Sequence, residues 1–194
     1  MPSLILLVAL LELGFTGPIT AGVPLLSASS GWKVQGVGWL LGAFGIGAAA
    51  TAGGLAIRRT PVRSGLLMGL GLLAIGIGLG SIGAVSMLPL DPRWSLTAAT
   101  AAAAVVGCGA GLFGTLVNTA LLLAAPQQHL GRVMSVVSLT TFTALPISLA
   151  ATSWLVEWTS SAVPFLAGAA LITAGAVLAL AQTSIRTLRT VPRR

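Results

Sequence analysis

The residue of this sequence best placed to do chemistry is a single carboxylate, Glu12, which interrupts a long apolar run. We place it about nine residues into an expected helix, or ~14 Å along the helix axis. A carboxylate at that depth in a membrane is costly unless it is protonated, paired or faces a cavity, so such acids are functional by default. Thr16 and Thr20 follow one and two turns later on the same face. We therefore predict a proton-coupling or cation-contacting group at Glu12, and the two threonines are candidates for lining the same cavity.

The alternative for this segment is structural. Glu12 would then be a hydrated acid close to the end of its helix, and Thr16 and Thr20 would bond back to the backbone around Pro18. Asn118, one turn beyond Gly114, is a further candidate for contact with a substrate. A membrane Asn more often bonds to a neighbouring helix, so that alternative also stays open.

The titratable residues exclude most other chemistry. The chain has one His, one Cys and three acids, so we expect no metal site, no disulfide and no cofactor. Cys108 is alone in an apolar run, where it is predicted to be a packing residue. An intramembrane protease would need a Ser nucleophile with a buried His base, but His129 lies in an expected loop. We therefore expect no catalytic residues and no enzyme.

The composition indicates the elements that position these residues. Hydrophobic residues make up 56% of the 194 residues and charged residues 7%, against about 25% charged residues in a soluble domain. The net charge of +7 does not indicate nucleic acid, because the basic residues sit at the ends of apolar runs rather than among stacking aromatics. The expected partner of this surface is the lipid bilayer.

The charges divide the chain into six long neutral stretches, each able to supply the ~20 residues that cross a bilayer. Because backbone in lipid must satisfy its own hydrogen bonds, each stretch is predicted to be a helix. The sequence predicts an all-α membrane protein, with one six-helix domain over residues 1–194 and a basic cytoplasmic tail over 185–194. The expected helices cover residues 3–27, 35–57, 64–88, 95–125, 132–157 and 161–184.

The distribution of Lys and Arg predicts the orientation. Of the ten basic residues, Lys33 and Arg93 fall on one side, and the other eight fall on the opposite side or in the tail. The positive-inside rule places the larger set in the cytoplasm, so a six-helix chain has both termini there. We expect a multi-pass protein of the cell membrane.

Small residues at helical spacing predict where helices pack. Gly45, Ala49 and Gly53 recur every four residues in the second expected helix, and Gly107 and Gly111 do so in the fourth. Such faces let helix backbones approach closely in lipid. The functional alternative is a smooth face on which helices slide or rock.

Three stretches carry a resemblance to a known family. Residues 53–59, GGLAIRR, resemble the second copy of the Gly-x-Leu-Ala-Asp-Arg signature of major facilitators, with Ile57 in place of the acidic residue. Residues 126–135, PQQHLGRVMS, resemble the Pro-x-x-x-x-Gly-Arg-Val-x-Ser stretch of the enterobactin-exporter and macrolide-efflux branch of that superfamily. Gly17-Pro18 and Val23-Pro24 resemble the seventh helix of the same branch.

The resemblance implies that this chain corresponds to helices 7 to 12, the C-terminal half of a major facilitator superfamily transporter, with its 3+3 helix repeat. It implies proton-coupled efflux of a small amphipathic molecule by alternating access, with a second six-helix half or a second copy as partner. It also implies that Arg58, Arg59 and Arg132 make gating contacts in cytoplasmic loops. For Arg132, contact with a lipid phosphate or another loop is the alternative.

Two other functions are alternatives to transport. A passive channel is not favoured, because the twin Asn-Pro-Ala signatures of water channels, a ring of charges and a filter sequence are all missing from the sequence. A degenerate or truncated fragment, or an assembly subunit without transport of its own, remains the principal alternative to a half-transporter.

Overall fold

The computed structural model describes residues 2–57, 64–124 and 130–181, and within these ranges the regular structure is entirely helical. The first rod consists of α1 (Pro2–Gly17), the π-helical turn η1 (Pro18–Gly22) and α2 (Val23–Ser29). It is followed by α3 (Lys33–Ile57), α4 (Ser64–Met87), α5 (Pro92–Ala124), α6 (Leu130–Trp158) and α7 (Val163–Ala181). The predicted all-α class is confirmed, and the bounds lie within a few residues of the expected ranges. The expected tail over 185–194 lies outside the described residues.

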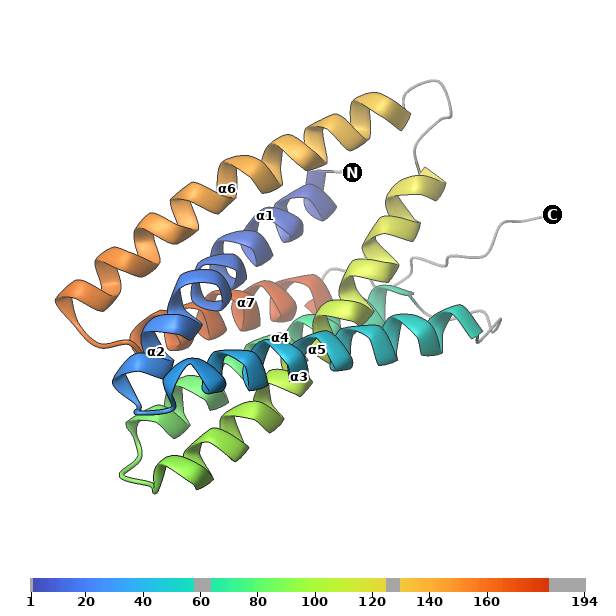
Figure 1. The fold of residues 1–194 in the computed structure, drawn as a ribbon. Coiled ribbons are helices and arrows are strands. Elements are labelled where there is room, and N and C mark those ends of the chain that lie inside the picture. The colour runs from blue at the N-terminus through green and yellow to red at the C-terminus, as the bar shows by residue number, and fades with distance from the viewer. Residues whose placement is uncertain (1, 58–63, 125–129, 182–194) are drawn as a thin grey trace.

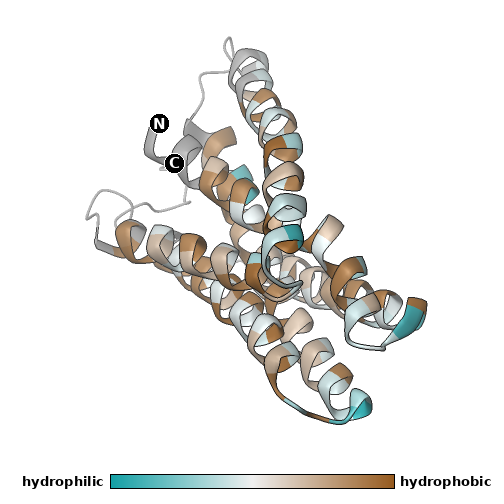
Figure 2. Ribbon diagram, turned by 90° about the vertical axis from the view of Figure 1, so that its left-hand side faces the viewer, coloured by the Kyte–Doolittle hydropathy of each residue, from teal (hydrophilic) through white to brown (hydrophobic). Residues whose placement is uncertain are grey.

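Length and composition make this a membrane protein. Among the described residues, five helical stretches are long and apolar enough to cross a bilayer, namely Val8–Ser29, Lys33–Ile57, Gly65–Met87, Pro92–Leu122 and Val137–Trp158. A sixth apolar stretch, Val163–Leu178, is shorter. The helices are hydrophobic along most of their length, and hydrophilic residues gather at the turns (Figure 2).

The first rod is a continuous helix with a wide turn in it. Pro18 has no backbone N–H, so it cannot donate the i→i−4 bond of a regular helix. The backbone N–H of Val23 bonds to the carbonyl oxygen of Pro18, five residues earlier, which is the pattern of a π-turn. The helical path therefore continues through the proline, but the angular spacing of side chains changes across η1.

A tight turn then reverses the chain. Gly31 has φ of 72°, a conformation that glycine adopts without strain, and Lys33 has φ of 57°. Between them Trp32 is buried, with 4% of its surface exposed, and its indole N–H donates a 2.9 Å hydrogen bond to Ser95 Oγ. This bond ties the start of α3 to the start of α5.

The helices pack in a linear order. The main contacts join α3 to α5, α5 to α4, α4 to α7, α7 to α1 and α1 to α6. In Figure 1 α1 and α6 lie side by side in one part of the bundle, and α3 and α5 lie in another. The core runs along α4, where Ile75, Leu79 and Ile82 are fully buried, and continues into Val106 of α5 and Phe165 of α7.

This order of helix packing is symmetric. Exchanging α1 with α5, α3 with α6 and α4 with α7 converts the α3–α5 contact into α6–α1 and the α4–α5 contact into α7–α1, and it leaves α4–α7 unchanged. The first three helical rods and the last three therefore occupy equivalent places in the packing.

Candidate functional site

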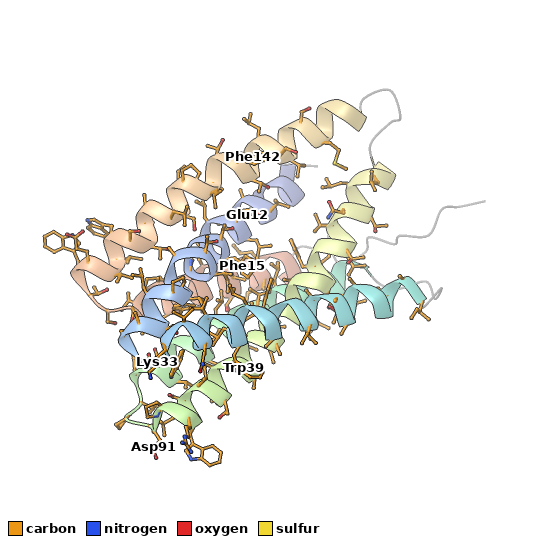
Figure 3. The ribbon with its side chains drawn as sticks, viewed as in Figure 1. Glu12, Phe15, Lys33, Trp39, Asp91 and Phe142 are labelled. Carbon is orange, nitrogen blue, oxygen red and sulfur yellow. The ribbon has the colours of Figure 1, made fainter. Side chains whose placement is uncertain are left out.

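Glu12 lies on α1, facing α6, and its carboxylate is half-buried. Thr16, one turn later on α1, donates a 2.6 Å hydrogen bond to Glu12 Oε2. Thr141 of α6 donates a longer bond, 3.4 Å, to Glu12 Oε1. Figure 3 labels Glu12 on α1 and Phe142, the neighbour of Thr141, on α6. The structure thus brings together an acid and two hydroxyl groups from two helices.

Hydroxyl partners are able to hydrogen-bond a carboxyl group in either of its protonation states. A threonine hydroxyl donates a hydrogen bond to a carboxylate, and it accepts one from a protonated carboxyl group. A Lys or Arg partner would instead favour only the charged form. Within the described residues the hydrogen bonds to Glu12 come from threonine hydroxyls.

Thr20 was predicted on the same face as Glu12 and Thr16, but it lies within η1 and is exposed. The prediction assumed regular α-helical spacing from residue 12 to residue 20. The π-turn breaks that spacing after Gly17. Of the two predicted threonines, Thr16 is therefore the one that the structure joins to Glu12.

One turn beyond Glu12, the hydroxyl of Ser148 on α6 forms hydrogen bonds to two backbone groups of α1. The N–H of Gly17 donates to Ser148 Oγ at 2.8 Å, and the Ser148 hydroxyl donates to the carbonyl oxygen of Leu13 at 2.7 Å. In a regular helix the N–H of residue 17 and the carbonyl of residue 13 bond to each other. Ser148 is 2% exposed, so its hydroxyl is a buried bridge between the two helices.

Gly17 must lack a side chain for this contact. A Cβ at Gly17 would meet the carbonyl oxygen and hydroxyl of Ser148 and the hydroxyl of Thr152. Thr141, Ser148 and Thr152 are seven and four residues apart, so they share one face of α6. We refer to these three residues as the hydroxyl stripe of α6.

The aromatic ring next to Glu12 connects the two parts of the bundle. Phe15 of α1 and Phe44 of α3 have ring centroids 5.7 Å apart and planes tilted by 42°. This geometry is typical of a favourable aromatic pair. The pair joins the helix of Glu12 to the helix that packs on α5.

The other predicted site residues lie elsewhere. Asn118 is exposed on α5, and its amide donates a 2.9 Å bond to the carbonyl of Gly114 on its own helix. Arg58 and Arg59 fall outside the described residues, and Arg132 is in the first turn of α6, where its side chain is not described. None of these positions is joined to Glu12 by the described contacts.

The small residues divide into two groups. Gly107 and Gly111 lie where α5 meets α3, and a Cβ on Gly107 would collide with the carbonyl of Phe44. Gly45, Ala49 and Gly53 are exposed on α3, and no atom of another described helix lies within 4 Å of a Cβ placed at Gly45 or Gly53. Within the described chain, α3 packs on α5 through a different glycine, Gly47.

Metal ligands do not gather in the described part of the chain. No group of three or more His, Cys, Asp or Glu residues lies close enough to hold an ion there. Cys108 is a free, half-buried thiol on α5. Glu12 and its hydroxyl partners therefore form the candidate site on their own.

No protein-family model matches the sequence, and no curated protein and no solved structure matches the chain.

Sequence reasoning missed the α6 side of this site. Thr141 and Ser148 were not proposed as site residues, although hydroxyl residues recur at helical spacing through residues 141–152. That recurrence was the available signal. Without a known packing partner, however, nothing distinguished it from hydroxyl groups bonded to their own backbone.

Proposed function

We propose that this chain is one six-helix half of a major-facilitator-type transporter, and that it exports a small amphipathic molecule coupled to protons. The observation that carries the proposal is Glu12, an acid in a membrane helix whose partners are the hydroxyls of Thr16 and Thr141. An ionisable residue inside a membrane marks a pathway for ions, protons or substrate unless another role is found for it.

The order of helix packing supports a 3+3 repeat. The contacts map onto themselves when the first three rods are exchanged with the last three. Because each set contains an odd number of membrane crossings, the second set enters the membrane with the opposite orientation to the first. Inverted repeats of this kind are characteristic of secondary transporters.

The π-turn in the first rod supports the proposed transport as well. Many transporters place their substrate and ion sites where the regular hydrogen bonding of a helix is interrupted, and π-turns inside helices are frequent at functional sites. Here the π-turn η1 begins six residues after Glu12, and Ser148 satisfies the backbone groups of Leu13 and Gly17. The acid and the π-turn are thus adjacent in the same rod.

A partner follows from the proposal. The substrate site of such transporters lies between two six-helix halves, and Glu12 is only half-buried in this chain alone. We infer that a second half, or a second copy, closes over α1. The purified monomer should therefore give no saturable transport in vesicles, and saturable efflux by a monomer would refute this architecture.

The test of the proton role uses ethidium, an amphipathic cation, as the exported probe. Cells expressing the chain would be loaded with ethidium, and efflux would be followed with and without an imposed pH gradient. Glu12→Gln keeps the shape of the protonated acid and should abolish pH-driven efflux, whereas Glu12→Asp should keep part of it. Glu157→Gln changes an exposed acid near the end of α6 and is the matched control.

The outcomes separate the alternatives. Wild-type pH dependence in Glu12→Gln would remove Glu12 from the mechanism. If a folded, membrane-inserted chain gave no ethidium efflux with any partner that copurifies with it, the assembly-subunit alternative would be favoured.

The orientation is tested separately. We propose that both termini are cytoplasmic, from the distribution of Lys and Arg. Reporter tags after Ser30 and after Asp91 should be outside, and a tag after Thr60 should be inside. An external C-terminus would overturn both the orientation and the proposed relation to major facilitators.

A further inference from the structure

An apolar groove of about 500 Å³ runs along the outer surface of the contact between α3 and α5. The groove is lined by Trp39 and Ala43 of α3 and by five residues of α5 between Leu96 and Ala104. Trp39 is 64% exposed, so its large ring stands at the surface beside the groove. The hollow exists because α5 presents small side chains there, at Thr97, Thr100, Ala101 and Ala104.

The groove matches the depth of one bilayer leaflet. From Leu96 to Ala104 the rise along α5 is ~12 Å, and half of a ~30 Å hydrocarbon core is ~15 Å. Both helices that form the groove are long and apolar enough to span the membrane. The exposed surface of such helices faces lipid unless another protein covers it.

A cation lies at one end of the groove. Arg93 is exposed and precedes Thr97 by four residues and Thr100 by seven, so the three residues share one face of α5. Its Cα is ~5 Å further toward the helix start than that of Leu96 at the rise of an α-helix. The bond from Trp32 to Ser95 holds the start of α3 beside this turn. Lys33 and Asp91 also lie at this end of the bundle (Figure 3).

We propose that this groove holds one acyl chain of a phospholipid and that Arg93 binds the phosphate of the same molecule. An apolar strip of leaflet depth with a guanidinium at one end is complementary to a molecule with a phosphate at the head and a hydrocarbon tail. The planar guanidinium matches phosphate geometry with two parallel hydrogen bonds. Trp94, exposed next to Arg93, has the amphipathic ring that favours the headgroup level.

This site is independent of Glu12 and of the proposed transport. Glu12 lies on α1 and bonds to α6, whereas the groove is formed by α3 and α5. The lipid-binding experiment therefore tests the groove alone, and a failure of the proposed transport would leave the proposed lipid site unaffected.

The test uses the full chain in nanodiscs that contain a phospholipid with a photoactivatable diazirine in its acyl chain. Cross-linked peptides are mapped by mass spectrometry, and we expect labelling to concentrate on residues 96–104 and on Trp39. Arg93→Ala should reduce this labelling on the order of tenfold, as expected for the loss of a charge-assisted pair. Ala101→Trp should reduce it similarly, because the indole fills the groove while the site is exposed enough to accept it.

Two controls match these variants. Lys33→Ala removes a cation at the same end of the bundle, six residues before Trp39 and off its face, and should leave the labelling unchanged. Ile77→Trp adds an indole at an exposed position of α4, away from the groove, and should also have no effect. Each variant is first checked for a single symmetric peak in size-exclusion chromatography.

Three results would overturn the proposal. Unchanged labelling in Arg93→Ala would remove the phosphate contact. Equal labelling by a diacyl glycolipid with the same photoactivatable chain and no phosphate would mean that the tail binds without recognition of the headgroup. In a separate experiment, disulfide cross-links between two copies that carry Ala43→Cys, absent from the unchanged chain with its single Cys108, would identify a second copy of the chain as the occupant.

Discussion

The α1–α6 contact and the α3–α5 contact occupy equivalent places in the packing order, yet they are built from different groups. At α3–α5 the backbones approach through glycines, and Gly107 lies directly against the carbonyl of Phe44. At α1–α6 the contact includes hydroxyls, because Ser148 bridges Leu13 and Gly17 and Thr141 reaches Glu12. In the first contact, which we call the glycine seam, backbone lies against backbone, and the hydroxyl there, Thr51 Oγ1 beside Gly111, bonds to carbonyl groups of its own helix. The second brings hydroxyl groups of α6 to an acid of α1, which is why the proposed proton pathway is placed there.

The two contacts should also differ in how much a substitution destabilises the protein. Close packing in lipid depends on small residues that let backbones approach, and each atom added at such a residue destabilises the contact. Hydrogen bonds between membrane helices contribute less, because the polar groups of a separated helix form hydrogen bonds with other partners. Substitutions at the glycine seam should therefore cost more than substitutions at the hydroxyl stripe of α6.

The largest effect is expected at Gly107. In Gly107→Leu the new side chain would start against the Phe44 carbonyl, so α3 and α5 would have to separate along their whole contact. We expect a loss of about 3 kcal/mol or more, the upper end of the range for overpacked cores. The measurement is the apparent melting temperature in detergent, followed by size-exclusion chromatography of heated samples.

Gly114→Leu is the control for this prediction. Gly114 is on the same helix, but a Cβ there meets no atom of another described helix within 4 Å. Its melting temperature should stay close to that of the unchanged protein. Equal losses in the two variants would mean that leucine disturbs α5 itself, and the seam would then not explain the difference between the two contacts.

A smaller effect is expected at Ser148. Ser148→Ala removes a buried hydroxyl that is bonded to the N–H of Gly17 and to the carbonyl of Leu13. We expect a loss of about 1–2 kcal/mol, since two bonds are lost but α1 is able to recover part of the energy by a direct bond between the two backbone groups. Ser153→Ala, an exposed serine of the same helix, is the control and should change little.

Hydrogen exchange sharpens this prediction. If Ser148 holds the first rod to α6, the amide of Gly17 should exchange faster in Ser148→Ala than in Ser153→Ala. Unchanged exchange at Gly17 would mean that the backbone of α1 satisfies itself without the serine. The hydroxyl would then be incidental to the π-turn at Pro18.

The sequence was sufficient for the helices but not for their partners. Long uncharged stretches predict the helical rods, because backbone in lipid leaves few alternatives. The small-residue pattern identified Gly107 and Gly111, which lie at a helix contact, and equally Gly45 and Gly53, which lie at the surface of the described chain. Periodicity marks a face that permits close approach. It carries no information on which helix, if any, approaches.

The candidate site was predicted in the same partial way. Glu12 stood out because charge in a membrane helix is rare, and Thr16 followed from helical spacing. Thr141 and Ser148 are more than 120 positions away in the chain, and their roles depend on how α1 crosses α6. Thr20 was placed by a spacing that the π-turn at Pro18 interrupts, which is a local backbone effect that hydropathy does not register.

The smallest effect is expected at the two threonines that contact Glu12, and it ranks the two sides of the site. Thr16→Val replaces the donor of the 2.6 Å bond and Thr141→Val the donor of the 3.4 Å bond, and both keep the branched shape of the side chain. A bond near 2.6 Å is typical of a hydroxyl donating to a carboxylate, whereas one near 3.4 Å is weak. Melting temperatures in detergent should therefore fall for Thr16→Val, by an amount equivalent to about 1 kcal/mol, and stay nearly unchanged for Thr141→Val. The same pair in the Glu12→Gln background should show a smaller difference, because an amide oxygen accepts a weaker hydrogen bond than a carboxylate oxygen does. A larger loss of melting temperature for Thr141→Val than for Thr16→Val would mean that α6 supplies the main partner of the acid. Glu12 would then stabilise the α1–α6 contact more than Ser148 does.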